Sequence, residues 1–390
     1  MQATPRLADA GGRGAPGVPG VPPVPGAVSR AELPELPELP ELPELPELPE
    51  LAVLGARRLP ARSPLPPVTR MNAGPADPDA AAGAAGHGRV PDGPVIVAPS
   101  SAGDPPAAGL RLGPPYVLAW FDPRDYVLQR PRLGDRTVDT VAAAVSLAVA
   151  RVVARGAVPV VLGGDHTVAL GGVRGVRGGL ARRARRGPPA PLFLLWLDAH
   201  PDVNTAETSP TGHLHGMVLS GLLGAGPLAT ADALPPERVT LAGVRSVDPG
   251  EADFLARRPG IARWDVETLR GDGWMAPLEA LLDRVRRAGG RLYVSLDLDV
   301  FDPQAAPGVA VPVGGGALPD PVLGLLRRIR ASGLLAGADV VELYPPADRE
   351  RQTARLAARA LAALGAAADW RDVLDPAADA LRRHAGRGAA

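Results

Sequence analysis

Five short polar clusters carry the side chains best suited to chemistry. Each follows a short hydrophobic run, and they are Gly-Gly-Asp-His at 163–166, Asp-Ala-His-Pro-Asp at 198–202, Arg-Ser-Val-Asp at 245–248, Asp-Leu-Asp at 297–299 and Glu342. A single acidic pair after a strand is ordinary, because Asp is common in turns. If the runs are parallel strands, however, all five clusters lie at the sheet edge where ligands bind. We therefore expect one shared site.

The composition of these clusters favours a two-metal centre. Four of the six histidines lie between His166 and His215, and the chain has no Cys. Imidazole and carboxylate suit Mn, Fe or Zn, and a carboxylate-rich set without sulfur leans toward Mn²⁺. Two such ions lower the pKa of bound water and can deliver hydroxide to an electron-poor carbon, for example in a guanidinium group. Four Asp carboxylates offset the charge of two divalent cations, so the cluster becomes negative once it also holds a hydroxide. Such a site suits a cationic substrate.

The elements that would position these clusters alternate between strands and helices. Short β-branched or leucine-rich runs predict strands at 95–97, 158–162, 192–197, 239–244, 292–296 and 338–341. Valines at helical spacing predict a helix over 135–155 that stops at Gly156, and a last helix over 351–364 stops at Gly365. This alternation indicates an α/β fold with a mostly parallel sheet. We expect one catalytic domain at 91–372 and a short tail at 373–390.

Residues 1–90 differ in character from the rest. They are rich in Pro, Gly and Ala, and a Glu-Leu-Pro repeat runs from Glu32 to Leu51. Pro at every third position removes amide donors and favours polyproline II, so this stretch cannot form a packed core. We expect a disordered, solvated tail, with a docking segment for a partner as the alternative. Met71 offers a second plausible start.

Charge and hydropathy exclude several classes of partner. Lys plus Arg and Asp plus Glu both number 42 in the 390 residues, so the broad basic footprint of a nucleic-acid binder is absent from the sequence. No apolar run approaches the roughly 20 residues that span a bilayer, and the first residues lack a secretory signal pattern. We expect a cytoplasmic protein whose partner is a small molecule.

Four motifs resemble those of the arginase and agmatinase family of ureohydrolases and occur in the family's order. They are Gly-Gly-Asp-His, Asp-Ala-His-x-Asp, Ser-Leu-Asp-Leu-Asp and Val-Glu-x-x-Pro. The resemblance extends from about residue 94 to 365. It implies a three-layer fold with helices on both sides of the sheet, a homotrimer or homohexamer, and two Mn²⁺ ions per subunit. It also implies that a metal-bridging hydroxide cleaves the guanidinium group of L-arginine to give L-ornithine and urea.

The resemblance further implies a role for each site residue. One ion would be held by His166, Asp198, Asp202 and Asp297, and the other by His200, Asp198, Asp297 and Asp299. Three residues are expected to be catalytic. Asp202 is one of them, besides being a metal ligand. His215 would shuttle a proton to the leaving amine, and Glu342 would face the guanidinium. The substrate α-carboxylate would contact Asn204, Ser209 and Thr211, and its α-amino group would contact Asp248 and Glu251.

Two positions limit how far the likeness to arginase extends. Ser246 stands where arginases commonly have Asp, and Val311 stands where they commonly have Thr near the reacting group. His213 is interpreted as structural or peripheral. None of these is an expected metal ligand, so the departures affect the choice of substrate more than the chemistry.

Other readings of the sequence remain open. The chain could be another ureohydrolase, acting on agmatine or a different guanidino compound, although agmatine has no α-carboxylate for Asn204 and Thr211 to bind. A catalytically inactive relative that serves as a binding or regulatory subunit would have lost a metal ligand, and all six are present. A zinc-dependent deacetylase on a related fold would usually have one metal, which fits the paired Asp-x-Asp less well.

Overall fold

Eight parallel strands form one sheet in the computed structural model, which describes residues 95–103, 105–118, 128–129, 137–184 and 186–365. The strand order is β2-β1-β3-β8-β7-β4-β5-β6. The strands are β1 (Val95–Ala98), β2 (Leu128–Gln129), β3 (Val160–Gly163), β4 (Leu192–Leu197), β5 (Val239–Ala242), β6 (Ala262–Trp264), β7 (Arg291–Asp297) and β8 (Leu335–Val341). The predicted parallel α/β fold is confirmed. The predicted tails at 1–90 and 373–390 lie outside the described residues, and the domain bounds stay predictions.

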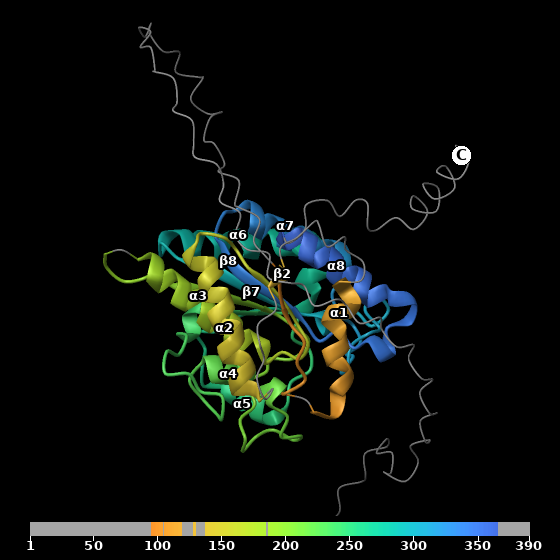
Figure 1. Cartoon of the computed structure of the whole chain (residues 1–390). Helices are drawn as coiled ribbons and strands as arrows, with labels where there is room; N and C mark the ends of the chain where they lie inside the picture. Colours follow the sequence, from red (N-terminus) through yellow and green to blue (C-terminus); the bar gives the residue numbers. More distant parts are fainter. Residues whose placement is uncertain (1–94, 104, 119–127, 130–136, 185, 366–390) are drawn as a thin grey trace, which may run out of the picture. The chain divides into compact units, whose positions relative to one another are not determined.

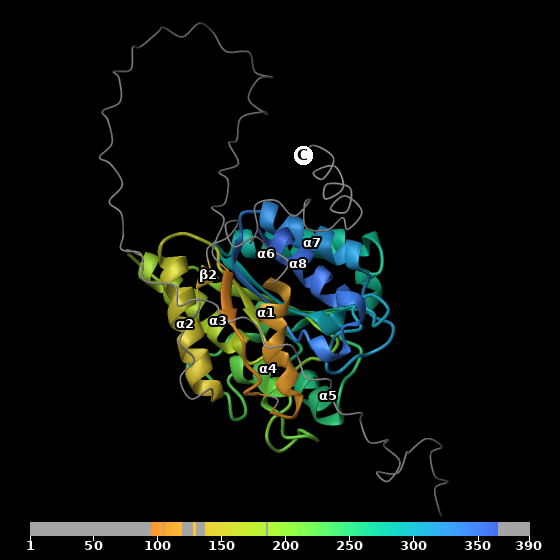
Figure 2. The same ribbon diagram turned by 45° about the vertical axis from the view of Figure 1, so that its right-hand side comes forward.

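Helices cover both faces of this sheet (Figure 1). They are α1 (Gly113–Leu118), α2 (Val138–Ala154), α3 (Val168–Arg183), α4 (Val218–Leu222), α5 (Pro249–Ala256), α6 (Met275–Arg287), α7 (Pro319–Ala331) and α8 (Gln352–Leu364). Short 3₁₀ segments lie at Pro105–Leu112, Leu214–Met217, Pro236–Arg238, Val266–Leu269, Asp272–Trp274, Leu298–Val300, Pro345–Ala347 and Arg349–Arg351. Helices α2 to α5 lie on one face, and α1, α6, α7 and α8 lie on the other (Figure 2).

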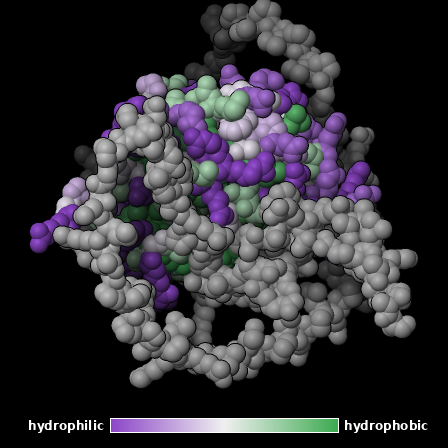
Figure 3. Space-filling view, turned by 90° about the horizontal axis from the view of Figure 1, so that it is seen from above, coloured by the Kyte–Doolittle hydropathy of each residue, from purple (hydrophilic) through white to green (hydrophobic). Residues whose placement is uncertain are grey.

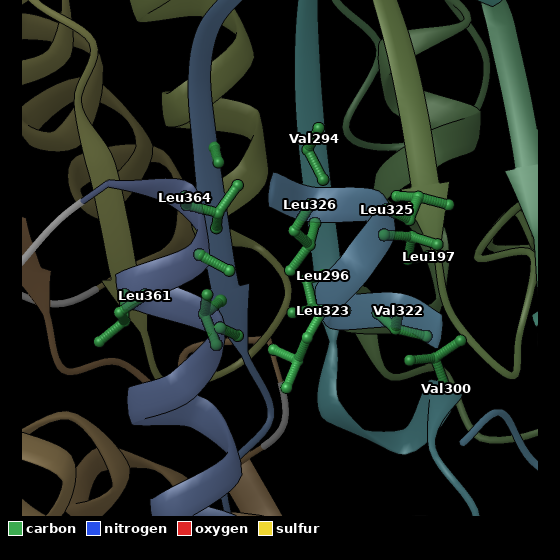
Figure 4. Packing of buried hydrophobic residues seen from close by; sticks show 14 of the residues in the cluster. Leu197, Val294, Leu296, Val300, Val322, Leu323, Leu325, Leu326, Leu361 and Leu364 are labelled. Atoms are coloured by element: carbon green, nitrogen blue, oxygen red, sulfur yellow. The ribbon is translucent and has the colours of Figure 1, made fainter. Parts of the chain in front are cut away.

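Each face of the sheet has its own hydrophobic core, because inward-facing side chains alternate along the strands. On the α7 and α8 face, Leu323 and Leu326 of α7 lie beside Val294 and Leu296 of β7, and Leu361 of α8 belongs to the same cluster (Figure 4). On the other face, the valines of α2 belong to the same buried cluster as Trp196 and other inward-facing strand residues. Burying apolar surface at about 25 cal/mol per Å² is the main source of the sheet's stability.

Helices α2 and α3 approach each other closely because α3 presents glycines to α2. A Cβ atom added at Gly171 would lie 2.6 Å from the carbonyl oxygen of Ala142, and one at Gly175 would lie 2.7 Å from that of Ser146. The predicted helix over 135–155 begins at Val138 in the structure, where Thr137 provides the N-cap, and Gly156 follows its end with φ +88°. Only glycine takes up that left-handed conformation at little cost.

The outer face on the side of α6 and α7 is mainly hydrophilic where it is visible, with smaller apolar areas among the polar residues (Figure 3). Within the described part of the chain, no helix has both the length and the apolar character to cross a membrane.

Candidate metal centre and substrate pocket

The strand order brings the five polar clusters together. They follow β3, β8, β7, β4 and β5, which are five neighbouring strands of the sheet. Because all these strands are parallel, their carboxyl ends lie along one edge. The predicted convergence therefore has a simple topological cause.

The first group of side chains surrounds the ring of His166. Its Nδ1 atom lies 3.3 Å from Asp198 Oδ2, 3.1 Å from Asp202 Oδ2 and 3.2 Å from Asp297 Oδ2. The ring is buried and stacks on the indole of Trp196, with 4.1 Å between ring centroids and 9° between planes. His166, Asp198 and Asp297 are close enough to share one cation.

The second group lies on the other side of Asp198. His200 Nδ1 is 3.5 Å from Asp198 Oδ1 and 2.9 Å from Asp299 Oδ2, and these three residues could hold a second cation. Asp198 thus directs one oxygen toward each group, as a bridging carboxylate would. Asp297, the other bridge implied by the family resemblance, belongs only to the first group; its Oδ1 accepts a hydrogen bond from the Asp299 amide at 2.8 Å.

Burial and mutual repulsion perturb the acidities in this cluster. Burial, together with the charges of Asp299 and Asp198, raises the pKa of Asp297 well above its usual value, and burial with the charge of Asp198 raises the pKa of Asp299 to about 6. Burial would likewise raise the pKa of Asp198, but hydrogen bonds with His166 and His200 hold it below its ordinary value. Burial lowers the pKa of His200, but the carboxylates beside it outweigh that effect and raise it to about 12.

Two of the site residues have an unusual backbone conformation. Asp202 has φ +51° and Glu342 has φ +67°, in the left-handed region that non-glycine residues rarely adopt. Such conformations cost free energy and persist where the surroundings hold them, often at functional sites. Glu342 is held because its amide donates to Gly164 O at 2.7 Å, and its Oε1 accepts from the His166 amide at 2.8 Å. The turn needs Gly164, since a Cβ there would lie 1.9 Å from Ser100 O.

A pocket of about 580 Å³ opens above the two groups. It is lined by His200, Asp202, Asn204, Ser209, Pro210, Thr211, His213, His215, Gly216, Ser246, Asp248, Glu251, Asp297, Asp299, Val309, Ala310, Val311, Glu342 and Tyr344. His166 and Asp198 do not line it, because they are buried beneath its floor. Every predicted catalytic and substrate-binding residue therefore lies on this one cavity.

Hydrogen bonds within the protein hold several of the residues that are predicted to contact the substrate. Asn204 Nδ2 donates to Asp248 Oδ2 at 2.8 Å. Glu251 accepts the Val203 amide at one oxygen and the Asp248 amide at the other, at 3.1 and 3.0 Å. Burial raises the pKa of Glu251 to about 7, against the lowering effect of the Asp248 amide. The structure thus gives Glu251 a supporting role in holding Asp248, besides the substrate contact predicted for it.

The hydroxyl groups of Ser209 and Thr211 at the pocket mouth accept backbone hydrogen bonds and keep their own hydrogens for a ligand. Ser209 Oγ accepts the Gly212 amide at 2.9 Å and Thr211 Oγ1 accepts the His213 amide at 3.2 Å. A hydroxyl oxygen that accepts a backbone amide can still donate its own hydrogen to a ligand. Deeper in the pocket, His215 Nδ1 lies 3.4 Å from Glu342 Oε1. The ring of His213 lies 5.7 Å from that of His215.

Two supporting residues were not recognised from the sequence. Trp196 donates its indole N–H to Asp198 Oδ2 at 2.9 Å, although its place in an apolar strand marked it only as a core residue. Arg245 donates to the backbone carbonyls of residues on three segments, namely Gly243, Asp299, Val300, Phe301, Val313 and Gly314. Arg245 could have been singled out from the sequence because it is the one Arg or Lys in the five polar clusters.

The fold and the site define a class: an α/β protein with two adjoining His/Asp groups, suited to a pair of metal ions, at the carboxyl ends of its strands. The sequence model of the Arginase family matches residues 97–366, and the chain belongs to that family. The resemblance predicted from the motifs is confirmed.

Individual relatives agree with this assignment. The chain is 42% identical over 204 residues to an arginase of Agrobacterium fabrum, covering 51% of this chain and 60% of that protein. It is 38% identical over 223 residues to an arginase of Bacillus caldovelox, covering 56% and 71%. The match thus spans about three fifths of the Agrobacterium protein's length. Among solved structures, Bacillus subtilis arginase aligns with a TM-score of 0.58 at 26% identity, covering 70% of this chain and 97% of that one.

Proclavaminate amidino hydrolase from Streptomyces clavuligerus also aligns, with a TM-score of 0.53 at 25% identity, covering 71% of this chain and 92% of that chain. Solved structures similar to this chain therefore include both an arginase and an amidino hydrolase with a different named substrate.

Proposed function

We propose that this protein is a dinuclear manganese hydrolase that cleaves the guanidinium group of L-arginine to L-ornithine and urea. The observation that carries the proposal is the pair of His/Asp groups that share Asp198 beneath an acidic pocket. The Arginase family assignment supports the same reaction.

The side chains fit divalent cations. His166 Nδ1 is buried without a hydrogen-bond donor or acceptor assigned to it, and it faces three carboxylate oxygens. A nitrogen lone pair among carboxylates is favourable only if a cation or a proton lies between them. Nitrogen and oxygen donors without sulfur suit Mn²⁺. When bound, two such ions would supply a hydroxide nucleophile near neutral pH.

The pocket itself selects and orients the substrate. Its lining carries six carboxylates, and none of the lining residues, all of which the structure describes, is Lys or Arg. A guanidinium cation is therefore attracted toward the floor, where Glu342 can accept its N–H groups. At the mouth, Ser209 and Thr211 can donate to an α-carboxylate while Asp248 accepts from an α-ammonium. These contacts fix the distance between the α-carbon and the reacting carbon, which converts binding into rate.

His215 can supply the proton that the leaving amine needs. Its ring is partly exposed in the pocket, and its Nδ1 lies 3.4 Å from Glu342 Oε1. Histidine is suited to this work because its ordinary pKa lies near physiological pH.

A second candidate substrate is a different guanidino acid. Ser246 and Val311 both line the pocket, and 46% of the Val311 surface is exposed. An uncharged hydroxyl and an apolar side chain at these positions would tolerate a longer or less polar chain than that of arginine. The chemistry at the pocket floor would be the same.

The test is urea release from a panel of guanidino compounds by the Mn²⁺-loaded protein. We expect kcat/KM for L-arginine to exceed that for agmatine by roughly 10⁴-fold, because agmatine leaves Asn204 and Thr211 without a carboxylate partner. Asp248→Ala should reduce this ratio mainly by impairing L-arginine. Equal rates for the two compounds would refute the arginine assignment, and faster turnover of another guanidino acid would favour the second candidate.

We also propose that the protein assembles as a homotrimer or homohexamer, on the basis of its family. Light scattering coupled to size-exclusion chromatography of the full chain tests this; a monomer would contradict it.

A further inference from the structure

A chain of buried hydrogen bonds runs from His166 into the sheet, away from the carboxylates. His166 Nε2 lies 2.8 Å from Ser295 Oγ, and Ser295 Oγ donates to Asp339 Oδ1 at 2.7 Å. Tyr293 donates its phenol hydrogen to Asp339 Oδ2 at 2.8 Å. Ser295, Asp339 and Tyr293 are all fully buried, on the adjacent strands β7 and β8.

The direction of each bond follows from the supply of hydrogens. Ser295 has one hydroxyl hydrogen, which it gives to Asp339, so it can only accept from His166. His166 must then carry a hydrogen on Nε2, and in the neutral ring this leaves Nδ1 with the lone pair. That is the nitrogen facing Asp198, Asp202 and Asp297. The buried chain thereby sets which ring nitrogen is available to a cation.

The structure makes room for the phenol at the far end of the chain. A Cβ atom at Gly172 of α3 would lie 1.9 Å from the Tyr293 hydroxyl oxygen, and one at Gly337 of β8 would lie 3.2 Å from the Tyr293 ring. Helix α3 and strand β8 thus both omit a side chain where Tyr293 lies. With the phenol in place, both oxygens of Asp339 accept a hydroxyl hydrogen, which fixes the orientation of its carboxylate.

We propose that Tyr293 and Asp339 are positioning residues that act through Ser295 to hold His166 with Nδ1 toward the metal centre. This inference rests on the dinuclear centre of the proposed function. Of the two histidines in the metal groups, the series of hydrogen bonds reaches His166, whereas His200 belongs to the other group. Disrupting these hydrogen bonds should therefore weaken binding of the cation held by His166 and leave binding of the cation held by His200 unchanged.

The test measures equilibrium Mn²⁺ binding to the full-length, chelator-stripped protein by electron paramagnetic resonance of free Mn²⁺. Asp339→Asn should weaken one of two sites by about 10- to 100-fold and leave the other near its native affinity, the range typical of residues that orient a metal ligand. Tyr293→Phe should shift the same site in the same direction by a smaller factor, and Ser295→Ala should match Asp339→Asn. The matched control is Tyr116→Phe, which removes a phenol hydroxyl on α1 and should leave both sites unchanged.

Tyr293→Phe keeps the ring and its packing, so it answers the question even if Asp339→Asn does not fold. Thermal unfolding of each variant with and without Mn²⁺ separates the metal effect from a general loss of stability. Native affinity at both sites in the folded Tyr293→Phe and Ser295→Ala proteins, or equal weakening of both sites, overturns the proposal. A native protein that binds fewer than two Mn²⁺ ions overturns the dinuclear centre, and this inference with it.

Discussion

At the scale of single residues, the site depends on carboxylates that are buried and close to one another. Asp297 shows this most clearly, because it faces His166 with one oxygen and accepts the Asp299 amide with the other. A negative charge in such a place is costly unless cations or protons compensate for it. Since its pKa is raised well above its usual value, a bound cation would favour the ionised form of Asp297.

Asp297→Ala should empty at least one metal site and abolish urea release while the fold survives, because the remaining ligands can no longer hold two cations close together. Elemental analysis and circular dichroism of the purified variant check this. The control is Asp320→Ala, which removes an exposed carboxylate on α7. Two Mn per subunit with near-native turnover in the Asp297 variant would disprove the assignment.

His215→Asn should keep both ions but slow turnover by roughly 10²- to 10⁴-fold, as expected for loss of a general acid–base group. His213→Asn, which changes the neighbouring ring, should have a much smaller effect. Metal content and the steady-state rate are measured on the same samples. Loss of Mn from the His215 variant would instead make His215 a ligand.

The affinity for Mn²⁺ should fall as the pH falls. Asp297 and Asp299 have raised pKa values, the latter about 6, and a carboxylate must release its proton to bind a cation. Below about pH 6 each displaced proton should reduce the apparent affinity by up to tenfold per pH unit. Mn²⁺ titrations at pH 8, 7, 6 and 5, with the fold monitored by circular dichroism, measure this. An affinity independent of pH would contradict the pKa shifts.

At the scale of elements, the loops after the strands are joined to one another by side chain to backbone hydrogen bonds. Arg245, in the loop after β5, donates to carbonyls of the turn at 299–301 after β7 and to those of Val313 and Gly314. The segment at 309–311 forms part of the pocket wall. One guanidinium group therefore links the loop after β5, the turn at 299–301 and the segment at 313–314, which follows the pocket-lining residues 309–311.

Arg245→Gln should destabilise the protein by about 2–4 kcal/mol, because several hydrogen bonds from a charged group are lost together. KM should rise more than kcat falls, since the pocket wall loses its support while the reacting groups remain. Chemical denaturation and steady-state kinetics measure the two effects. The control is Arg263→Gln, at an exposed position of β6. Equal behaviour of the two variants would show that Arg245 has no such role.

At the scale of the whole molecule, all the predicted site residues lie between His166 and Glu342, within the part that the structure describes. The Glu-Leu-Pro repeat at 32–51 supplies none of them. The catalytic activity should therefore not depend on the N-terminal segment.

Deleting residues 1–70 should leave the specific activity of the Mn²⁺-loaded protein essentially unchanged, because that segment lacks core-forming and site residues. The truncated and full-length proteins are compared at equal metal content and in the same oligomeric state. A large fall in kcat for a folded, fully metallated truncation would show that the segment contributes to the site or to its assembly.

The sequence by itself determined the strands that carry the site and the clusters that follow them. Apart from residues such as Ser295 and Asp339, each of these strands is a short, mainly apolar run, because a strand covered on both faces has no need of alternating polar residues. The motifs likewise identified the family, since chemistry constrains residue types at fixed spacings. Even so, the boundaries shifted: the strand predicted at 239–244 ends at Ala242, and the one predicted from 158 starts at Val160.

Only the tertiary structure decided how these strands are ordered and what supports the site. Strand β8, which comes last in the chain, lies between β3 and β7, and the short strands β2 and β6 form the two edges of the sheet. The left-handed backbone at Asp202 and Glu342 and the contact of Tyr293 with Asp339 also belong to this level. These features join residues far apart in the chain, so local pattern and propensity cannot predict them. Their free energy comes from packing and buried hydrogen bonds that exist only once the sheet has formed.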